Sequence, residues 1–361
     1  MAAQMNTNKS FVSRVFVLSA SAVLSGCSGV VMKPHGDIAQ QQAQLIVTST
    51  LLMMLIIVPV IALSLYFAYR YRQSNTEASY SPDWDHSTRL ELVIWGAPLL
   101  IIIALGAITW ISTHKLDPFR PLDRIAEGRP VPAGMKPLVV YAVSMDWKWL
   151  FIYPEQGIAT VNEMAAPVDR PIHFRFTSTT VMNTFYVPAL AGMIYTMPGM
   201  ETQLHAVINK AGIYDGLSAH YSGAGFSDMR FKFHGLSDGD FKRWVESSKT
   251  GGTTLTRADY LKLEEPSKKE PIRRFANVEP GLWNAIVDRC VDGRKMCASQ
   301  MMAIDAAGGA GKGGVAGTMR SPWRDAEGGR RERIVVAALC TPTNLQGLPI
   351  EIDVARAVVQ N

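Results

Sequence analysis

Cysteine is scarce in this chain. Its 361 residues include only Cys27, Cys290, Cys297 and Cys340, so the long stretch between the first two has none. The spacing of the three late cysteines matches no metal site. In an oxidising compartment one pair of them can form a disulfide and leave one thiol over. The sequence leaves open which two residues pair.

Charge is also sparse. Charged residues make up 19% of the chain, and the formal net charge of +5 is spread along it. No basic block with interleaved aromatic residues occurs, which argues against a nucleic-acid partner. The chain also has no internal repeat, which argues against a solenoid or a propeller.

The N-terminus has the pattern of an exported lipoprotein. Lys9 and Arg14 precede a short apolar core, residues 16–24, which ends in Leu24-Ser-Gly-Cys27. The core is too short to span a bilayer and is flanked as a signal peptide is. We therefore expect residues 1–26 to be cleaved and Cys27 to carry a lipid. The alternative is an ordinary signal peptide with an incidental cysteine.

Two longer apolar stretches follow, 45–69 and 92–111, and neither contains a charged residue. Each can cross about 30 Å of hydrocarbon as a helix. Pro59 and Pro98 lie inside them, which membrane helices tolerate. The sequence therefore predicts a hairpin of two membrane spans.

Basic residues indicate how this hairpin is oriented. Arg70 and Arg72 follow the first span and Arg89 precedes the second, so the short connecting loop carries positive charge at the membrane edges. Such loops stay in the cytoplasm. A lipidated Cys27 lies on the outer side of the inner membrane, which agrees. Everything after Thr113 is then expected in the periplasm.

The periplasmic segment is rich in strand patterns. Several short runs alternate between apolar and polar residues and are separated by turn residues, which is typical of a β-sandwich or barrel. The runs are 138–144, 148–153, 171–178, 184–188, 192–197, 201–208, 212–217 and 229–234. Helices are predicted only later, from a Ser237-Asp238 cap to about Ser248 and, more weakly, at 257–263 and 281–289.

These patterns predict the domain organisation of the chain. The expected segments run from a signal peptide through the membrane hairpin to a β-domain, a helical extension and a flexible tail. They are the signal peptide (1–26), a periplasmic N-terminal segment (27–44), span 1 (45–69), a cytoplasmic loop (70–91), span 2 (92–111), a linker (112–136), the β-domain (137–236), the helical extension (237–298) and the tail (299–361).

Three motifs in the β-domain carry a family resemblance. They are Val143-Ser-Met-Asp-Trp-Lys-Trp149, continuing through 153–157; the segment Val181-Met-Asn-Thr-Phe-Tyr-Val-Pro188; and the loop from Tyr214 to Met229. With the lipobox and hairpin before them, they resemble subunit II of the haem–copper respiratory oxidases, specifically the quinol-oxidising, cytochrome bo-type branch. The resemblance implies a two-span α-helical hairpin and an all-β, cupredoxin-like periplasmic domain with a few C-terminal helices.

In the related cytochrome c oxidases this domain holds the dinuclear copper centre CuA. The ligand pattern of CuA can be aligned on this chain by placing its methionine at Met229. Among the side-chain ligands, only this methionine is then kept. The other positions are Asn183, Ser218, His220, Ser222 and Phe226. Two soft thiolates bridge such coppers, and protonated serine hydroxyls cannot replace them. The resemblance therefore implies the shape of the site without its metal.

The resemblance also implies the function of the chain. The implied function is to serve as a subunit of a proton-translocating ubiquinol oxidase, which reduces oxygen to water. This subunit has no catalytic metal. Haems, CuB and the quinol site lie in subunit I, and subunits III and IV and membrane lipids are further partners. This chain is expected to bind no cofactor itself.

Two further features have roles that the resemblance suggests. Glu91, at the cytoplasmic start of span 2, corresponds to a glutamate at the mouth of a proton-uptake path. The alternative is a helix N-terminal acid paired with Arg89. Trp147 and Trp149 correspond to an aromatic patch that receives electrons from cytochrome c. Without copper we expect them to pack against the loop or against subunit I.

Three other functions remain as alternatives. The first is a cytochrome c oxidase subunit, against which the missing loop cysteines argue. The second is a periplasmic copper-handling lipoprotein, which requires a cluster of Met, His or Cys donors; His220 and Met229 alone make a poor pair for a single copper. The third is a structural anchor of another membrane complex.

Overall fold

The computed structural model describes residues 29–79 and 81–309 and two short strands, 334–336 and 350–352. The predicted signal peptide, Cys27, Cys340 and most of the predicted tail lie outside the described residues. The chain divides into two compact units. The first holds the residues up to Pro130 together with Pro188–Gly192, and the second holds the remainder.

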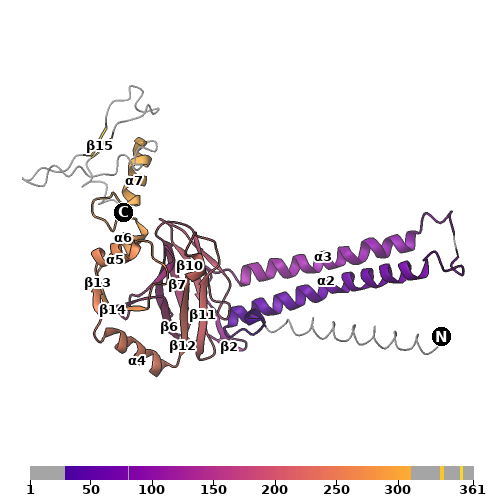
Figure 1. The fold of residues 1–361 in the computed structure, drawn as a ribbon, viewed down its shortest axis with the longest axis horizontal. Coiled ribbons are helices and arrows are strands. Elements are labelled where there is room, and N and C mark those ends of the chain that lie inside the picture. Colours follow the sequence, from indigo (N-terminus) through magenta and orange to yellow (C-terminus); the bar gives the residue numbers. More distant parts are fainter. Residues whose placement is uncertain (1–28, 80, 310–333, 337–349, 353–361) are drawn as a thin grey trace, which may run out of the picture. The chain divides into compact units, whose positions relative to one another are not determined.

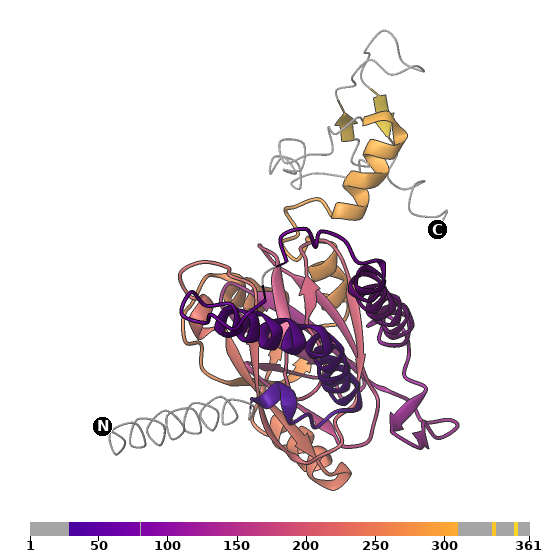
Figure 2. The ribbon, with the colours of Figure 1, turned by 90° about the vertical axis from the view of Figure 1, so that its right-hand side faces the viewer.

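The first unit is built on two long helices, α2 (Asp37–Arg70) and α3 (Thr88–Lys115), which run side by side (Figures 1 and 2). Both are long and apolar enough to cross a membrane. They extend beyond the predicted spans because polar residues continue each helix past the apolar stretch. Large apolar side chains such as Leu65 and Leu92 are exposed along them, as lipid-facing or subunit-facing surfaces require.

The start of α2 is fixed by a buried ion pair. Asp37 lies in the first turn, where a negative charge is favourable, and is 3% exposed. Its Oδ2 accepts hydrogen bonds from Nε of Arg124 (3.0 Å) and Nε2 of Gln41 (2.7 Å). The backbone N–H groups of His35 and Gly36 both donate to the carbonyl of Ala189. A short 3-10 turn (Val30–Met32) and the strand pair β1 (Arg124–Ala126) and β2 (Arg129–Pro130) complete this unit.

The second unit is a two-sheet sandwich. The seven-stranded sheet has the order β10-β7-β3-β4-β5-β14-β13, and the five-stranded sheet has the order β6-β12-β11-β8-β9 (Figure 1). The strands of the first are β3 (Leu138–Met145), β4 (Lys148–Tyr153), β5 (Ile158–Val161), β7 (Ile172–Ser178), β10 (Thr202–Ala206), β13 (Thr253–Leu255) and β14 (Arg273–Val278). Those of the second are β6 (Glu163–Pro167), β8 (Asn183–Tyr186), β9 (Ile194–Thr196), β11 (Gly212–Ser218) and β12 (Arg230–Leu236).

Aromatic side chains fill the space between the sheets. The Trp149 ring on β4 meets Phe185 edge-on at 5.6 Å and Phe231 at 5.7 Å. Phe174 and Phe176 on β7 are also fully buried and pack on Phe185. Edge-to-face pairs of this kind add to the free energy gained by burying the rings.

Every residue of β4 is buried, because both faces of its sheet are covered. On the face opposite Trp149, Leu150 and Ile152 pack with residues of the C-terminal extension, including Phe275 and Trp283. The prediction of a helical extension separate from the β-domain was therefore wrong in part. β14 pairs with β5, so the extension contributes strands to the sheet as well as helices to its face.

The helices of the extension begin close to where the sequence predicts. α4 (Asp238–Lys249) is capped by Ser237, whose Oγ accepts from the Asp240 N–H at 3.2 Å. α5 (Arg257–Glu264) and α6 (Leu282–Val287) follow. The predicted tail from residue 299 begins instead with helix, α7 (Ala298–Ile304) and a π turn (Asp305–Gly309), and further on β15 (Ile334–Val336) pairs with β16 (Ile350–Ile352).

Candidate functional site

Three positions that the family resemblance aligns with copper ligands, Asn183, Ser218 and Met229, lie close together at the ends of β8, β11 and β12. Ser218, at the end of β11, is 2% exposed, and its Oγ lies 3.2 Å from Oδ1 of Asn183 on β8. Its backbone N–H donates to the carbonyl of Met229, whose side chain is fully buried. The carbonyl of His220 is 3.4 Å from the Ser218 hydroxyl. Strand pairing of β11 with β8 and β12 sets this arrangement.

The middle of the loop is held by Trp147. Its indole Nε1 donates to the carbonyl of Ser222 at 3.1 Å. A Cβ on Gly225 would lie 2.3 Å from the indole ring, so only glycine permits this approach. Trp147 itself has a left-handed backbone, with φ of 67°, which turns the chain between β3 and β4. The Oγ of Ser222 is buried and has no hydrogen-bond partner in the described part of the chain.

The two remaining positions make aromatic contacts. The Phe226 ring, in a 3-10 turn (Phe226–Asp228), lies 5.6 Å from the ring of Tyr221. The His220 ring meets Tyr195 edge-on at 6.0 Å. Among the described residues, His220 belongs to no cluster of three His, Cys, Asp or Glu side chains that is close enough to hold a metal ion.

The donor atoms present do not fit a dinuclear copper centre. Such a centre needs two bridging thiolates, and the chain offers the hydroxyls of Ser218 and Ser222 instead. The Ser218 hydroxyl is bonded to Asn183, and Phe226 offers no lone pair at all. Met229 remains as a single weak thioether donor. The strands and the loop have the arrangement that the resemblance predicts, but the side chains at the aligned positions do not include the required thiolates.

The two tryptophans do not form a shared surface patch. Trp149 is fully buried between the sheets, whereas Trp147 is half-buried against the loop. Lys148 between them is also buried. Its ammonium donates to the carbonyl of Glu265 and to the Ser267 hydroxyl, both at 2.7 Å, and burial lowers the pKa of this lysine. The three residues therefore join the loop, the core and the extension.

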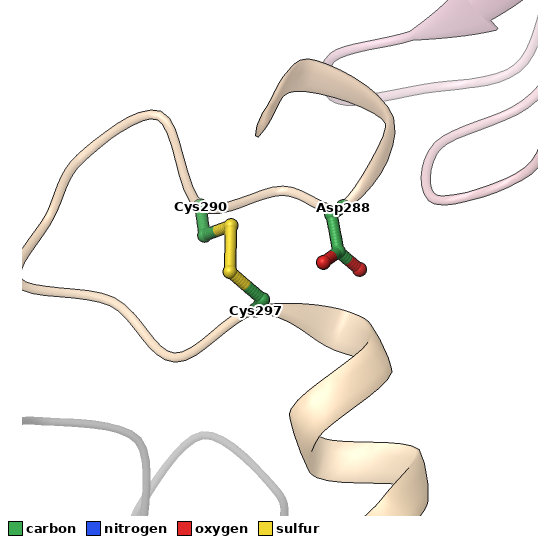
Figure 3. A group of neighbouring side chains, drawn as sticks. All are labelled: Asp288, Cys290 and Cys297. Carbon is green, nitrogen blue, oxygen red and sulfur yellow. A yellow bond between two sulfur atoms is a disulfide. The ribbon is translucent and has the colours of Figure 1, made fainter. Parts of the chain in front are cut away.

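Cys290 and Cys297 form a disulfide that closes the turn between α6 and α7 (Figure 3). Asp288 lies beside it, but its carboxylate binds the start of α7, accepting from the N–H of Ser299 at 2.8 Å and from its hydroxyl at 2.6 Å. The joined sulfurs are not thiolates, and the carboxylate is already hydrogen-bonded. This cluster is therefore a structural tie, and sequence spacing alone did not identify the pair.

Glu91 lies in the first turn of α3, after the N-cap Ser87. Its Oε1 is 2.8 Å from Nδ1 of His86, so the pairing with Arg89 considered from the sequence is replaced by one with histidine. Half of the Glu91 side chain is exposed. The acid is favourably placed near the positive end of the helix dipole and remains accessible to solvent in the chain by itself.

The sequence did not single out a buried ion-pair group in the sandwich. Glu163 on β6 is 5% exposed, and its carboxylate contacts Nε2 of His234 (3.2 Å) and Nη2 of Arg274 (2.8 Å). Burial alone raises the pKa of Glu163, but the hydrogen bonds and charges of His234 and Arg274 outweigh it, so the pKa lies below its usual value. Glu163 lies outside every predicted strand, so no pattern in the sequence indicated that it is buried.

Comparison with known proteins agrees with this architecture. The family model described as the periplasmic domain of cytochrome c oxidase subunit II matches residues 155–234, and the one described as the COX aromatic rich motif matches residues 249–294. Cytochrome bo(3) ubiquinol oxidase subunit 2 of Pseudomonas aeruginosa is 48% identical over 272 residues, which are 75% of this chain and 80% of the relative. Ubiquinol oxidase subunit 2 of Acetobacter aceti is 47% identical over 285 residues, 79% of this chain and 90% of the relative.

A solved structure also matches part of the chain. It is the periplasmic domain of subunit II of cytochrome oxidase from Bradyrhizobium japonicum, 25% identical, with 30% of this chain and 91% of that domain covered at a TM-score of 0.30. Two membrane-capable helices followed by a cupredoxin-like domain and an aromatic-rich extension define subunit II of the respiratory oxidases. The chain belongs to the ubiquinol oxidase subunit 2 family.

Proposed function

We propose that this chain is a subunit, without metal of its own, of a proton-translocating oxidase that passes electrons from ubiquinol to oxygen. The observation that carries the proposal is the donor set of the loop, where Ser218 and Ser222 stand at the positions of bridging thiolates. In this proposal haems and CuB belong to subunit I, and subunits III and IV complete the complex.

The choice of electron donor explains why the loop can do without copper. Cytochrome c is soluble in water and needs a relay on the periplasmic side. Ubiquinol dissolves in the bilayer and can reach subunit I from within it. The β-domain then needs to pass no electron, and polar and aromatic side chains can occupy the positions of the ligands.

The role we propose for the chain is architectural. The apolar surfaces of α2 and α3 pack on subunit I in the inner membrane, and the β-domain covers the periplasmic side of that subunit. Lipidation of Cys27 adds an anchor at the outer leaflet. The two membrane helices supply the main attachment.

Glu91 is the residue that we propose takes part in proton entry. Its carboxylate is half exposed, lies at the predicted cytoplasmic end of α3 and contacts Nδ1 of His86 at 2.8 Å. A carboxylate at a membrane edge is a reasonable candidate for the mouth of a proton path.

The test is oxygen uptake by the complex purified through a tag on this chain. Ubiquinol and reduced cytochrome c are supplied in parallel to the same preparation, with haem content measured as the control for assembly. The proposal expects uptake with ubiquinol and none with cytochrome c.

The other outcomes separate the alternatives. Uptake with cytochrome c would mean that a second relay exists and that the loop has been misinterpreted. A preparation without haem and without uptake on either donor would favour a copper-handling lipoprotein or an anchor of another complex.

A further inference from the structure

Two histidines face each other on the outer surface of the seven-stranded sheet. His173 on β7 and His205 on β10 are directly paired across the antiparallel ladder, and their rings stack with centroids 4.3 Å apart and an interplanar angle of 11°. Both are half-buried. β10 is the edge strand of its sheet, so the pair is not enclosed by a further strand.

The surroundings leave the ring nitrogens available for a ligand. Nε2 of His173 lies 3.1 Å from Oε1 of Gln203, so that nitrogen carries the proton and Nδ1 keeps its lone pair. Neither ring nitrogen of His205 has a hydrogen-bond partner among the described residues. A hydrogen bond from the second ring nitrogen to a carbonyl oxygen is the usual way in which a metal-binding histidine is oriented.

The charged neighbours on this face do not compete for the site. Arg175 and Glu201 form an ion pair, in which Nε of Arg175 donates to Oε1 of Glu201 at 2.6 Å. Arg175 also donates to the Tyr141 hydroxyl. Neutral imidazole is the form that binds metal ions.

We propose that His173 and His205 form a two-histidine site for a divalent transition-metal ion, with Cu²⁺ bound more tightly than Zn²⁺. Side chains directly opposite on antiparallel strands have Cβ atoms about 4.5–5.5 Å apart. The rings are stacked in the structure, so binding one ion requires rotation about the soft χ2 torsions, which would bring one nitrogen of each ring to the roughly 2.0–2.1 Å of metal–imidazole bonds. Imidazole suits both ions, and nitrogen sites bind Cu²⁺ more strongly than Zn²⁺.

The site is open rather than closed. Two protein ligands leave the other coordination positions to water or an added ligand. A bound ion links β10 to β7 and stabilises the folded form by mass action. This site is separate from the loop 218–229 and takes no part in electron transfer. It is therefore independent of the proposed oxidase function, in which the chain carries no redox metal.

The test uses the purified full-length chain in detergent, titrated with Cu²⁺ and followed by calorimetry and electron paramagnetic resonance. We expect one Cu²⁺ per chain with hyperfine coupling from two imidazole nitrogens. His173→Asn and His205→Asn should each weaken binding at least tenfold. Gln203→Leu should weaken it by about 10–100-fold, the usual effect of losing an outer partner.

His220→Asn is the matched control, because it removes a half-buried histidine from the loop 218–229. Its Cu²⁺ affinity should equal that of the wild type. Copper binding that depends on His220 and not on His205 would overturn the proposal. A wild-type chain with a Kd for Cu²⁺ weaker than about 1 mM would also overturn it, and this outcome requires no variant to fold.

Discussion

At the scale of single residues, the loop 218–229 is organised by hydrogen bonds and by packing against Trp147. Asn183 holds the Ser218 hydroxyl, and Trp147 holds the carbonyl of Ser222. Gly225 completes the arrangement because its missing side chain admits the indole. The loop thus keeps a defined conformation through packing and hydrogen bonds between neutral groups.

Gly225→Ala should destabilise the β-domain by about 1–3 kcal/mol, the usual cost of overpacking a filled space. The backbone φ at Gly225 is −104°, so the cost arises from the clash with Trp147 and not from backbone strain. Gly293→Ala is the matched control, since no atom lies within 4 Å of its added Cβ. Urea unfolding followed by fluorescence measures both.

A double-mutant cycle with Trp147→Ala identifies the origin of the effect. If the clash is the cause, the cost of Gly225→Ala falls markedly in the Trp147→Ala background. Equal costs in both backgrounds would assign the effect to the backbone of the loop instead.

Glu163→Gln should lower the free energy of unfolding by about 1–3 kcal/mol at neutral pH, because Arg274 and His234 lose a charged partner. In the folded state the hydrogen bonds and charges of His234 and Arg274 hold the pKa of Glu163 below its ordinary value of 4.5. The ion pair therefore stabilises the wild type fully above that value and is lost as the pH falls through the folded-state pKa.

The measurement is the urea midpoint as a function of pH. Below about pH 4.5 the wild type should lose stability more steeply than Glu163→Gln. Glu155→Gln, which removes a partly exposed carboxylate 3.7 Å from Arg170, is the control. Parallel curves for wild type and Glu163→Gln would contradict the assigned coupling.

At the scale of elements, the C-terminal extension is part of the core of the β-domain. Trp283 on α6 stacks on Tyr141 of β3 at 4.4 Å and is 7% exposed. β14 joins the seven-stranded sheet beside β5. The extension therefore covers one face of the sheet and lengthens it.

Trp283→Ala should cost about 3–5 kcal/mol of unfolding free energy, the range for truncation of a large buried aromatic residue. Ile272→Ala serves as the control, because Ile272 is 52% exposed and its truncation should stay within about 0.5 kcal/mol. Chemical denaturation of the two variants measures this. Equal stability would mean that the extension docks without supporting the sheet.

The strands with clear alternation were predictable from the sequence, and the others were not. β7, β10 and β12 alternate because one face of each packs into the sandwich. β5 and β6 are short runs of small residues, and β14 begins with two arginines, so pattern alone does not distinguish them from loops. The pairing of distant segments, such as His173 with His205, requires the register of the sheet.

The family resemblance also supplied the positions that align with copper ligands, but not their contacts. The absence of thiolates could be seen directly, since it is a matter of residue type. The hydrogen bond from Trp147 to Ser222 and the space at Gly225 depend on backbone geometry between strands far apart in the chain. Local propensities carry no information about such contacts.

At the scale of the whole molecule, substitution of Glu91 tests whether the membrane hairpin takes part in proton uptake. Glu91→Ala in the assembled oxidase should slow turnover and proton uptake by about tenfold or more if its carboxylate admits protons. Glu91→Asp should restore part of the rate, and His86→Ala is the control for the ion pair. Unchanged turnover and proton uptake in Glu91→Ala would contradict this role.

The central claim, that the β-domain passes no electrons through a metal, is tested most directly by removing the imidazole and the thioether that remain in the loop 218–229. In the assembled complex, His220→Ala combined with Met229→Leu keeps the volume of the buried methionine nearly unchanged. The account predicts ubiquinol-driven oxygen uptake within about twofold of the wild type, with the same copper-to-haem ratio. A fall of about tenfold together with a loss of copper would contradict it.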